Sequence, residues 1–399
     1  MKRTQPLVAM MVSWGALLAL ACGATSSGNE QHGDAGSGGD SSSVGGGGSD
    51  DGPTVTETPL EPGSCGVVRT IELPTLSMEP NEAVTRQGTS FVLRPWKSGE
   101  QSSLLHTYTV DERGRNPRFF EAYGSTNDVS WPAFLSEAGV ALEVFVTRGE
   151  GGGEDSFESR AWANPNEPPE ARGNILRAPW RGTNDVALVP SLDGKRALFA
   201  LWPVGLSDPT VAVIGSDGAR VGEAITLSVP TTSALCTAVV PTARGGFVSF
   251  VDSNHELRLV ELGQDGELVR QASWPLPSAG YGCPVFALEP TGVAFLLDRA
   301  EADLPTDKGL YRLDADGSVT EVPVTLPGEA LEVAMLGDDP LVLHWSPQGA
   351  ELSRPARGEL WPITLPPGYP RRVPSEPGNI WLDVQGLDTP RSLVLLSCR

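Results

Sequence analysis

Histidine and cysteine are scarce: the 399-residue sequence has four histidines and five cysteines. Three of the histidines, His106, His255 and His344, come after residue 65 and lie far apart in the sequence. Catalytic and metal sites usually draw on dense sets of such residues, and no HExxH, Gly-x-Ser-x-Gly or phosphate-loop pattern is present. We therefore expect no catalytic residue, no cofactor and no metal ligand.

Basic residues are also few. The chain has 29 Lys and Arg against 50 Asp and Glu, which gives a net charge of −21. Such a charge repels nucleic acid and anionic lipid headgroups, so a nucleic-acid partner is not expected. Apart from Leu7–Ala21, no long apolar run is present, and that run is short for a membrane span.

The N-terminus has the pattern of an export signal. Lys2 and Arg3 precede the apolar run, which ends in Leu18-Ala19-Leu20-Ala21-Cys22. This ending resembles the bacterial lipobox, which implies that a signal peptide, 1–21, is removed and that Cys22 becomes diacylated, with palmitate or a similar acyl chain. The alternative is an ordinary secretory signal followed by an incidental cysteine.

A disordered tether is expected over 22–64. Between Gly23 and Thr54 the only large aliphatic residue is Val44, and the segment is rich in Gly, Ser and Asp, so it cannot bury a core. Gly23, rather than Asp, follows Cys22; by resemblance to sorting in enteric bacteria this favours the outer membrane. The sequence thus predicts a bacterial cell-envelope lipoprotein, periplasmic or surface-facing, held to the membrane by its lipid.

From residue 65 onward the composition and a repeat predict an all-β fold. The 46 glycines and 35 prolines argue against long helices. One unit, 185–227, contains four expected strands with tight turns at Asp193-Gly194 and Asp217-Gly218, and Asp-Gly is a strong hairpin signal.

The repeat predicts a seven-bladed β-propeller over 65–399. The third-to-fourth-strand turn recurs at Gly114, Gly173, Gly218, Gly266, Gly317 and Gly358, at intervals of 41 to 59 residues. First-to-second-strand turns are expected at Gly88, Gly139, Gly194, Gly245-Gly246, Gly292, Asp338-Asp339-Pro340 and Gly378. The sequence thus has seven first-to-second-strand turns but only six third-to-fourth-strand turns. Residues 66–74 supply the missing outer strand by completing the C-terminal blade. Six blades, and more distantly a pair of β-sandwiches, are the alternatives.

Two segments carry a family resemblance. Ser191–Ala200 and the turn Leu313–Gly317 resemble the propeller repeat of the periplasmic TolB-type proteins. The resemblance covers two or three blades and concerns turn structure. It implies a propeller fold and an envelope location, and it transfers no functional residue.

The four cysteines after Cys22 are expected to form two disulfides, as is usual in an oxidising compartment. Cys236 and Cys283 begin the inner strands of consecutive units, so they are expected to pair around the central channel. Cys65 and Cys398 stand where the closing blade lacks its turn, which predicts that they pair and close the ring.

Binding is expected on the face that carries the second-to-third-strand loops and the connections between blades. Its candidate residues are Trp180, Asp252, His255, Trp274, Tyr281, Asp298, Arg299, Asp303 and Arg371. Aromatic residues beside charges suit a protein or glycan partner. We expect a monomeric, non-enzymatic binding protein. The alternative is a propeller hydrolase or lyase that acts on an extracellular polymer. Asp314 and Asp316 fit a hairpin turn better than a calcium site.

Overall fold

The computed structural model describes residues 52–74, 84–98, 104–123, 130–147, 155–163, 170–178, 185–202, 208–227, 235–242, 245–276, 283–289, 293–298, 308–326, 329–346, 349–375, 377–386 and 389–399. The signal peptide, Cys22 and most of the expected tether lie outside these ranges. The chain divides into two units, 1–47 and 48–399, and the propeller belongs to the second. No helix in the described ranges has the length and apolar character that a membrane crossing requires.

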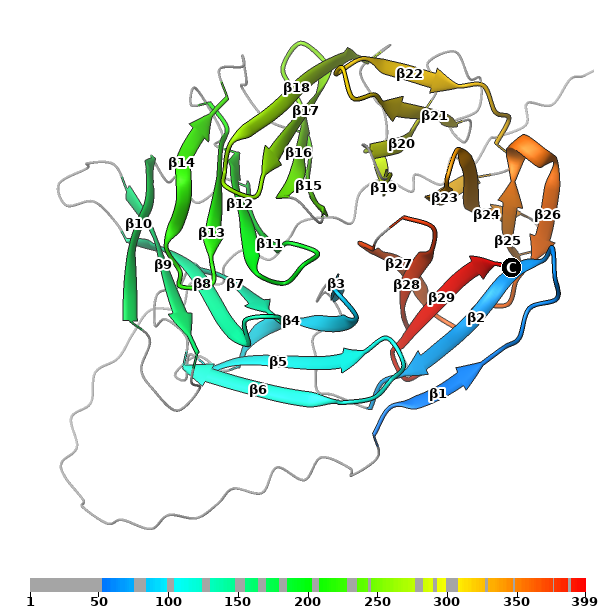
Figure 1. Ribbon diagram of the computed structural model, residues 1–399, viewed down its shortest axis with the longest axis horizontal. Helices are drawn as coiled ribbons and strands as arrows, with labels where there is room; N and C mark the ends of the chain where they lie inside the picture. Colours follow the sequence, from blue (N-terminus) through cyan, green and yellow to red (C-terminus); the bar gives the residue numbers. More distant parts are fainter. Residues whose placement is uncertain are drawn as a thin grey trace, which may run out of the picture. The chain divides into compact units, whose positions relative to one another are not determined.

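Seven antiparallel sheets follow one another around a ring, which confirms the predicted seven-bladed propeller and excludes six blades (Figure 1). Blades 1 to 3 are β3 (Val84–Gln87), β4 (Ser90–Ser98), β5 (Leu104–Asp111) and β6 (Arg118–Tyr123); β7 (Ser130–Leu135), β8 (Val140–Thr147), β9 (Asp155–Trp162) and β10 (Glu170–Ala178); β11 (Asp185–Pro190), β12 (Arg196–Trp202), β13 (Thr210–Gly215) and β14 (Arg220–Thr226). Blades 4 and 5 are β15 (Leu235–Thr242), β16 (Gly245–Val251), β17 (Glu256–Gly263) and β18 (Leu268–Pro275); β19 (Val285–Leu288), β20 (Val293–Asp298), β21 (Lys308–Leu313) and β22 (Val319–Val322). Blade 6 is β23 (Glu329–Leu336), β24 (Asp339–Ser346), β25 (Gly349–Arg354) and β26 (Glu359–Pro362), with the short 3-10 helix η2 (Pro355–Arg357) before its last strand.

Blade 7 joins the two ends of the domain. Its strands are β27 (Tyr369–Val373), β28 (Ile380–Gln385), β29 (Ser392–Cys398) and β2 (Cys65–Glu72). β2 pairs with β29 over its whole length, with Cys65 opposite Cys398. The prediction that an N-terminal strand completes the last blade is therefore confirmed.

Both predicted disulfides are present. Cys65 is bonded to Cys398 across the closing strands, with Cα atoms 4.0 Å apart. Cys236, in β15, is bonded to Cys283, just before β19, with Cα atoms 5.0 Å apart. One bond closes the ring and the other joins the inner edges of blades 4 and 5.

A strand that the sequence does not predict lies outside β2. β1 (Thr54–Glu57) pairs with β2 and makes blade 7 a five-stranded sheet. It falls inside the segment expected to be tether, so strand structure begins before Cys65. Val55 packs against the apolar cluster between blades 7 and 1, which explains why so short and polar a strand is held.

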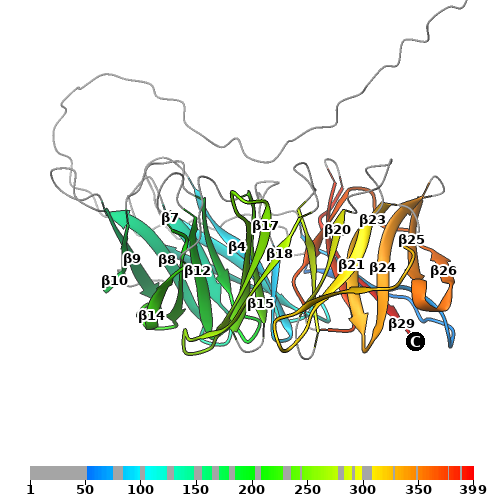
Figure 2. The same cartoon turned by 90° about the horizontal axis from the view of Figure 1, so that it is seen from above.

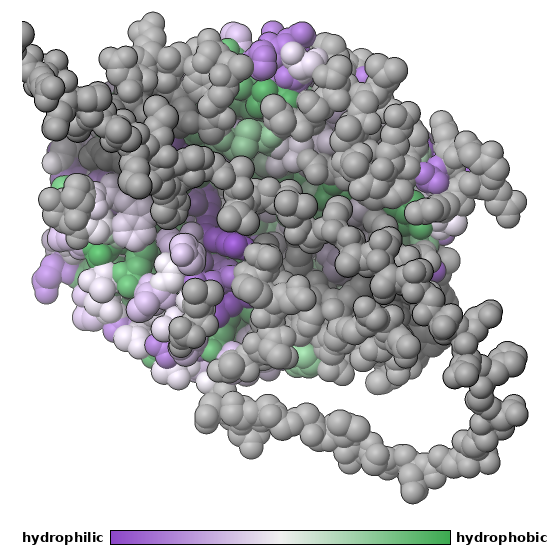
Figure 3. All heavy atoms as spheres, turned by 180° about the vertical axis from the view of Figure 1, so that it is seen from behind, coloured by the Kyte–Doolittle hydropathy of each residue, from purple (hydrophilic) through white to green (hydrophobic). Residues whose placement is uncertain are grey.

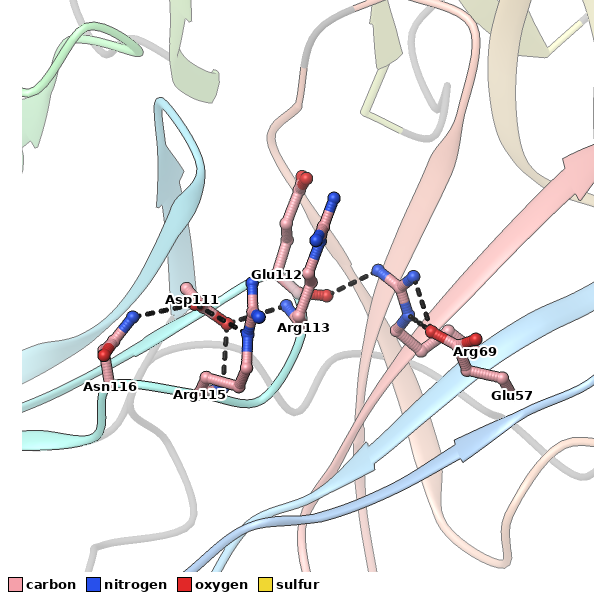
Figure 4. Close-up of polar contacts among 7 residues, drawn as sticks. All are labelled: Glu57, Arg69, Asp111, Glu112, Arg113, Arg115 and Asn116. Atoms are coloured by element: carbon pink, nitrogen blue, oxygen red, sulfur yellow. Dashed lines mark hydrogen bonds and ion pairs between the residues drawn. The ribbon is translucent and has the colours of Figure 1, made fainter.

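Figure 4 shows the polar contacts where blade 7 meets blade 1. Arg69, in β2, donates from Nη2 to Glu57 Oε1 over 2.9 Å and from Nη1 to the carbonyl oxygen of Glu112 over 2.7 Å. Glu112 belongs to the β5–β6 turn, where Asp111 Oδ1 accepts a hydrogen bond of 2.7 Å from the backbone N–H of Arg115. One guanidinium thus links β1, β2 and blade 1.

Burial follows position in the blade. Every residue of β16, a second strand, is buried, whereas β18, the outer strand of the same blade, is mostly exposed. Neighbouring blades cover both faces of the inner strands, and the cores lie between blades; the rings of Phe157 and Phe199 are 5.7 Å apart across the interface of blades 2 and 3. Apolar side chains on both faces of these strands are required for such packing.

Turn chemistry sets the hairpins. Gly218, Gly266 and Gly317 have φ of 80°, 79° and 86°, which a residue with a Cβ rarely adopts, and they close the third-to-fourth-strand turns as predicted. The prediction at Gly173 is wrong: this glycine lies inside β10, beside a shift of register between Ala171 and Gly173. A glycine with positive φ suits a bulge as well as a turn.

Figure 2 shows the ring from its side. We call the edge that holds the C-terminus the lower face; it carries the first-to-second and third-to-fourth turns. The opposite edge, the upper face, carries the second-to-third connections and the links between blades.

Candidate binding face

The described residues of the predicted binding face stand at the upper ends of their strands. Asp252 and His255 lie in the β16–β17 connection, and Trp274 pairs in register with Leu257, near the start of β17. Asp298, the last residue of β20, is opposite Lys308, the first of β21. Arg371 lies in β27, and Trp180, Tyr281, Arg299 and Asp303 are outside the described residues. Hydrophilic residues are visible near the middle of this face in Figure 3.

In blade 4 the acidic candidate holds a turn together. Asp252 is 2% exposed, and its Oδ1 accepts hydrogen bonds from the backbone N–H of Asn254 and of Glu256 over 2.8 and 3.0 Å. Its Oδ2 accepts from Arg258 Nε over 2.8 Å, and Arg258 also pairs with Glu256 over 2.6 Å. The carboxylate of Asp252 is thus fully occupied by the turn and by Arg258, so Asp252 has a structural role.

Trp274 is half-buried rather than displayed. Its ring centroid lies 5.8 Å from that of Tyr311, and it packs against the apolar cluster between blades 4 and 5. His255 is exposed and has a φ of 59°, with its carbonyl oxygen accepting a hydrogen bond from the N–H of Leu276 over 2.9 Å. In blade 4, then, the tryptophan serves interblade packing and the histidine remains on the surface.

Blade 7 contains a similar pair of a buried acid and an arginine, and a second arginine beside it is not part of the pair. Asp383 is 2% exposed and binds Arg391 through two hydrogen bonds of 2.7 Å, from Nε and from Nη2. Gln385 donates a further bond of 3.0 Å to Asp383. Arg371 is opposite Asp383 in the β27–β28 register but is exposed and has no ion-pair partner among the described residues.

Two exposed aromatic residues at upper strand ends of blades 6 and 7 were missed from the sequence. Tyr369, two residues before Arg371 in β27, is 72% exposed. Trp345, near the upper end of β24 in blade 6, is 38% exposed. Tyr369 follows a Pro-Pro-Gly segment that looks like a connection, and only its spacing of two from Arg371 signals a shared face.

A buried ion pair lies deeper between blades 6 and 7. Glu332 Oε2, from β23, is 3.7 Å from Arg372 Nη1, from β27, and the two side chains are 16% and 15% exposed. Burial raises the pKa of Glu332 to about 7, against the opposing attraction of Arg372 and Lys308. This pair joins two inner strands, as the Cys236–Cys283 disulfide does between blades 4 and 5.

The other polar candidates have structural surroundings. His344 is 1% exposed, its Nδ1 lies 3.9 Å from Glu351 Oε2, and burial lowers its pKa. Asp316 accepts from the N–H of Ser318 over 2.9 Å, in the hairpin turn expected there. Within the described ranges no three His, Cys, Asp or Glu residues gather in a way that would hold a metal ion.

A groove of about 420 Å³ lies on the outer part of blade 7, near the ring-closing disulfide. Leu60, Val68 and Leu395 form its apolar part, and Arg69 and Arg399 lie at its border. Arg69 is bound to Glu57 and Glu112, and Arg399 donates to the carbonyl oxygen of Leu60 over 3.1 Å. Both arginines here therefore already have protein partners, whereas Arg371 has no ion-pair partner in the part of the chain that the structure describes.

Comparison with known proteins shows no matching family model and no matching curated protein. Among solved structures, the chain is similar to the β-propeller domain of the Trilobed protease from Pyrococcus furiosus, with a TM-score of 0.43, 9% identity, and coverage of 79% of this chain and 95% of that one. It is also similar to TolB from Acinetobacter baumannii, with a TM-score of 0.32, 13% identity, and coverage of 79% of each chain. Similarity at this level transfers no function to the chain.

Proposed function

We propose that this chain is a lipid-anchored protein of the bacterial envelope whose propeller binds a protein or glycan partner without catalysing a reaction. The observation that carries the binding role is the upper end of blade 7, where Tyr369 is 72% exposed and Arg371 is exposed and unpaired among the described residues. Tyrosine and arginine are the residue types that most often dominate binding surfaces.

The anchor is supported by sequence alone, through the apolar run and Cys22. A single acyl chain binds membranes only marginally, so stable attachment depends on the several chains added at this cysteine. In a Cys22→Ser chain we expect the protein to leave the membrane fraction and labelled palmitate to be absent. Membrane retention of this variant after a high-salt wash would overturn the anchor.

The binding role is tested with the same full-length Cys22→Ser chain, tagged and incubated with envelope extract. We expect capture of a partner that is lost in the Tyr369→Ala, Arg371→Gln double variant. The matched control is Leu360→Ala, which removes a 51% exposed side chain from the outer strand β26. Equal loss of capture in this control, or turnover of an extracellular polymer by the purified chain, would overturn the proposal.

A further inference from the structure

Tyr369 and Arg371 are two exposed residues of the same strand on blade 7. They point to the same side of β27, because side chains two apart in a strand share a face, and their Cα atoms are separated by about 6.6 Å. Pro370 stands between them and fixes its own φ. β27 is also paired with β28 along its length, with Tyr369 opposite Gln385. The backbone of both residues is therefore fixed before any ligand arrives, and binding has to order only the two exposed side chains.

Within the described ranges no acid pairs with Arg371, because its cross-strand neighbour Asp383 is already occupied. Both carboxylate oxygens of Asp383 are taken by Arg391, and Gln385 donates to one of them. Other arginines near blade surfaces have acids of their own: Arg258 has Asp252 and Glu256, and Arg312 has Glu289. Among the described residues, Arg371 is thus an exposed arginine without an acidic partner, and its guanidinium can bind an anion at short range despite the net negative charge of the protein.

The spacing of an aromatic ring and a guanidinium selects the class of anion. A guanidinium binds a carboxylate through two parallel hydrogen bonds, and a tyrosine ring offers an apolar face beside it. A hexuronate residue of a polysaccharide has both groups within one sugar ring: a C–H face and a carboxylate. A protein partner usually needs about 800 Å² on each side, far more than these two side chains offer.

We propose that the upper end of blade 7 binds uronate residues of an acidic polysaccharide, with the sugar ring on Tyr369 and the carboxylate on Arg371. This inference rests on the proposed binding function and names the ligand chemistry of that site. Trp345, 38% exposed on the neighbouring blade, extends the same upper surface toward blade 6.

The test is calorimetric titration of the full-length Cys22→Ser chain with a short oligogalacturonate. We expect Arg371→Gln and Tyr369→Ala each to weaken binding by about tenfold or more, the effect of losing one charge-assisted contact or one stacked ring. The matched control is Arg357→Gln, which removes one positive charge from a 56% exposed side chain beside Asp339, in the third-to-fourth connection of blade 6 on the lower face. The affinity of this control variant for oligogalacturonate should change by less than about twofold.

Two further ligands distinguish binding of a uronate from binding of an uncharged sugar or of a peptide carboxylate. The methyl ester of the same oligosaccharide keeps the sugar ring but lacks the charge, and it should bind at least about tenfold more weakly. Polyglutamate carries its carboxylates on a peptide, and it should not compete with oligogalacturonate for the site. Equal binding of the ester, preference for polyglutamate, or an equal loss in Arg357→Gln would overturn the inference. If envelope capture still depends on Tyr369 and Arg371 while oligogalacturonate does not bind, the uronate assignment fails and the binding function stands.

Discussion

The Cγ2 methyl of Val55, in β1, occupies the space that a side chain at Gly114 would need. Gly114 is buried in the β5–β6 turn of blade 1, so the extra strand of blade 7 is packed directly against the neighbouring blade. This contact joins the first strand of the domain to a turn that follows it by about sixty residues.

We therefore expect Gly114→Ala to lower the free energy of unfolding by about 2–3 kcal/mol, because the new Cβ strains a backbone with a φ of 70° and displaces Val55. Gly88→Ala is the control: its φ is 56°, but a Cβ there meets nothing within 4 Å. Urea unfolding of both variants measures the difference. Equal losses would show that β1 does not depend on this contact.

The two disulfides should differ in their contribution to stability. They close loops with sequence separations of 333 and 47 residues, for which the chain-entropy model gives about 6 and about 4 kcal/mol, both upper figures. We expect the Cys65→Ser, Cys398→Ser double variant to lose more stability than the Cys236→Ser, Cys283→Ser variant in denaturant unfolding. The reverse order would contradict the ring-closing role of Cys65–Cys398.

Glu332 should make stability fall as the pH rises. Its pKa is raised from the model-compound value of 4.5 to about 7 in the folded chain, so between these values the folded state holds a proton that the unfolded state has lost. Stability contributed by this group is thus present below about pH 4.5 and lost by about pH 7. Relative to Glu332→Gln, the unfolding free energy of the wild type should drop by an amount on the order of 3 kcal/mol across this window. A flat or rising difference in urea titrations would exclude this effect.

The hydroxyl group of Tyr108 is buried between blades 1 and 7 without a hydrogen-bond partner among the described residues. Burial raises the pKa of this phenol to about 12. Because a buried polar atom without a partner costs free energy, Tyr108→Phe should raise the unfolding free energy by about 1 kcal/mol while keeping the ring contacts. A lower melting temperature for this variant would mean that the hydroxyl has a partner.

The architecture is predictable from the sequence because local chemistry and counting determine it. Within the repeat, Asp-Gly turns such as Asp265-Gly266 and Asp316-Gly317 mark hairpins. Seven inner turns against six outer ones require a strand from the other end of the chain, and that requirement places Cys65 beside Cys398. None of these inferences needs knowledge of distant packing.

The features that the sequence did not predict depend on packing between residues far apart in the chain. β1 is four residues long and largely polar, and it is held by Val55 against a glycine of another blade, which no local pattern reveals. Trp274 alternates with exposed residues as a surface tryptophan would, yet it faces the next blade. Arg371 was among the predicted residues, but its lack of a partner follows from the Asp383–Arg391 contact, which only the fold brings together.

Blade 7 draws its two outer strands, β1 and β2, from the first part of the domain and its three inner strands from the last, with Cys65 and Cys398 separated by 333 residues. During synthesis from the N-terminus, β1 and β2 are made first and have no partner sheet until β29 is complete. Blades 1 to 6 each use consecutive strands and can assemble as they emerge. Blade 7 therefore cannot be completed before the C-terminal strand is available, and a chain shortened by a few C-terminal residues would lose part of the pairing between β2 and β29, together with Cys398.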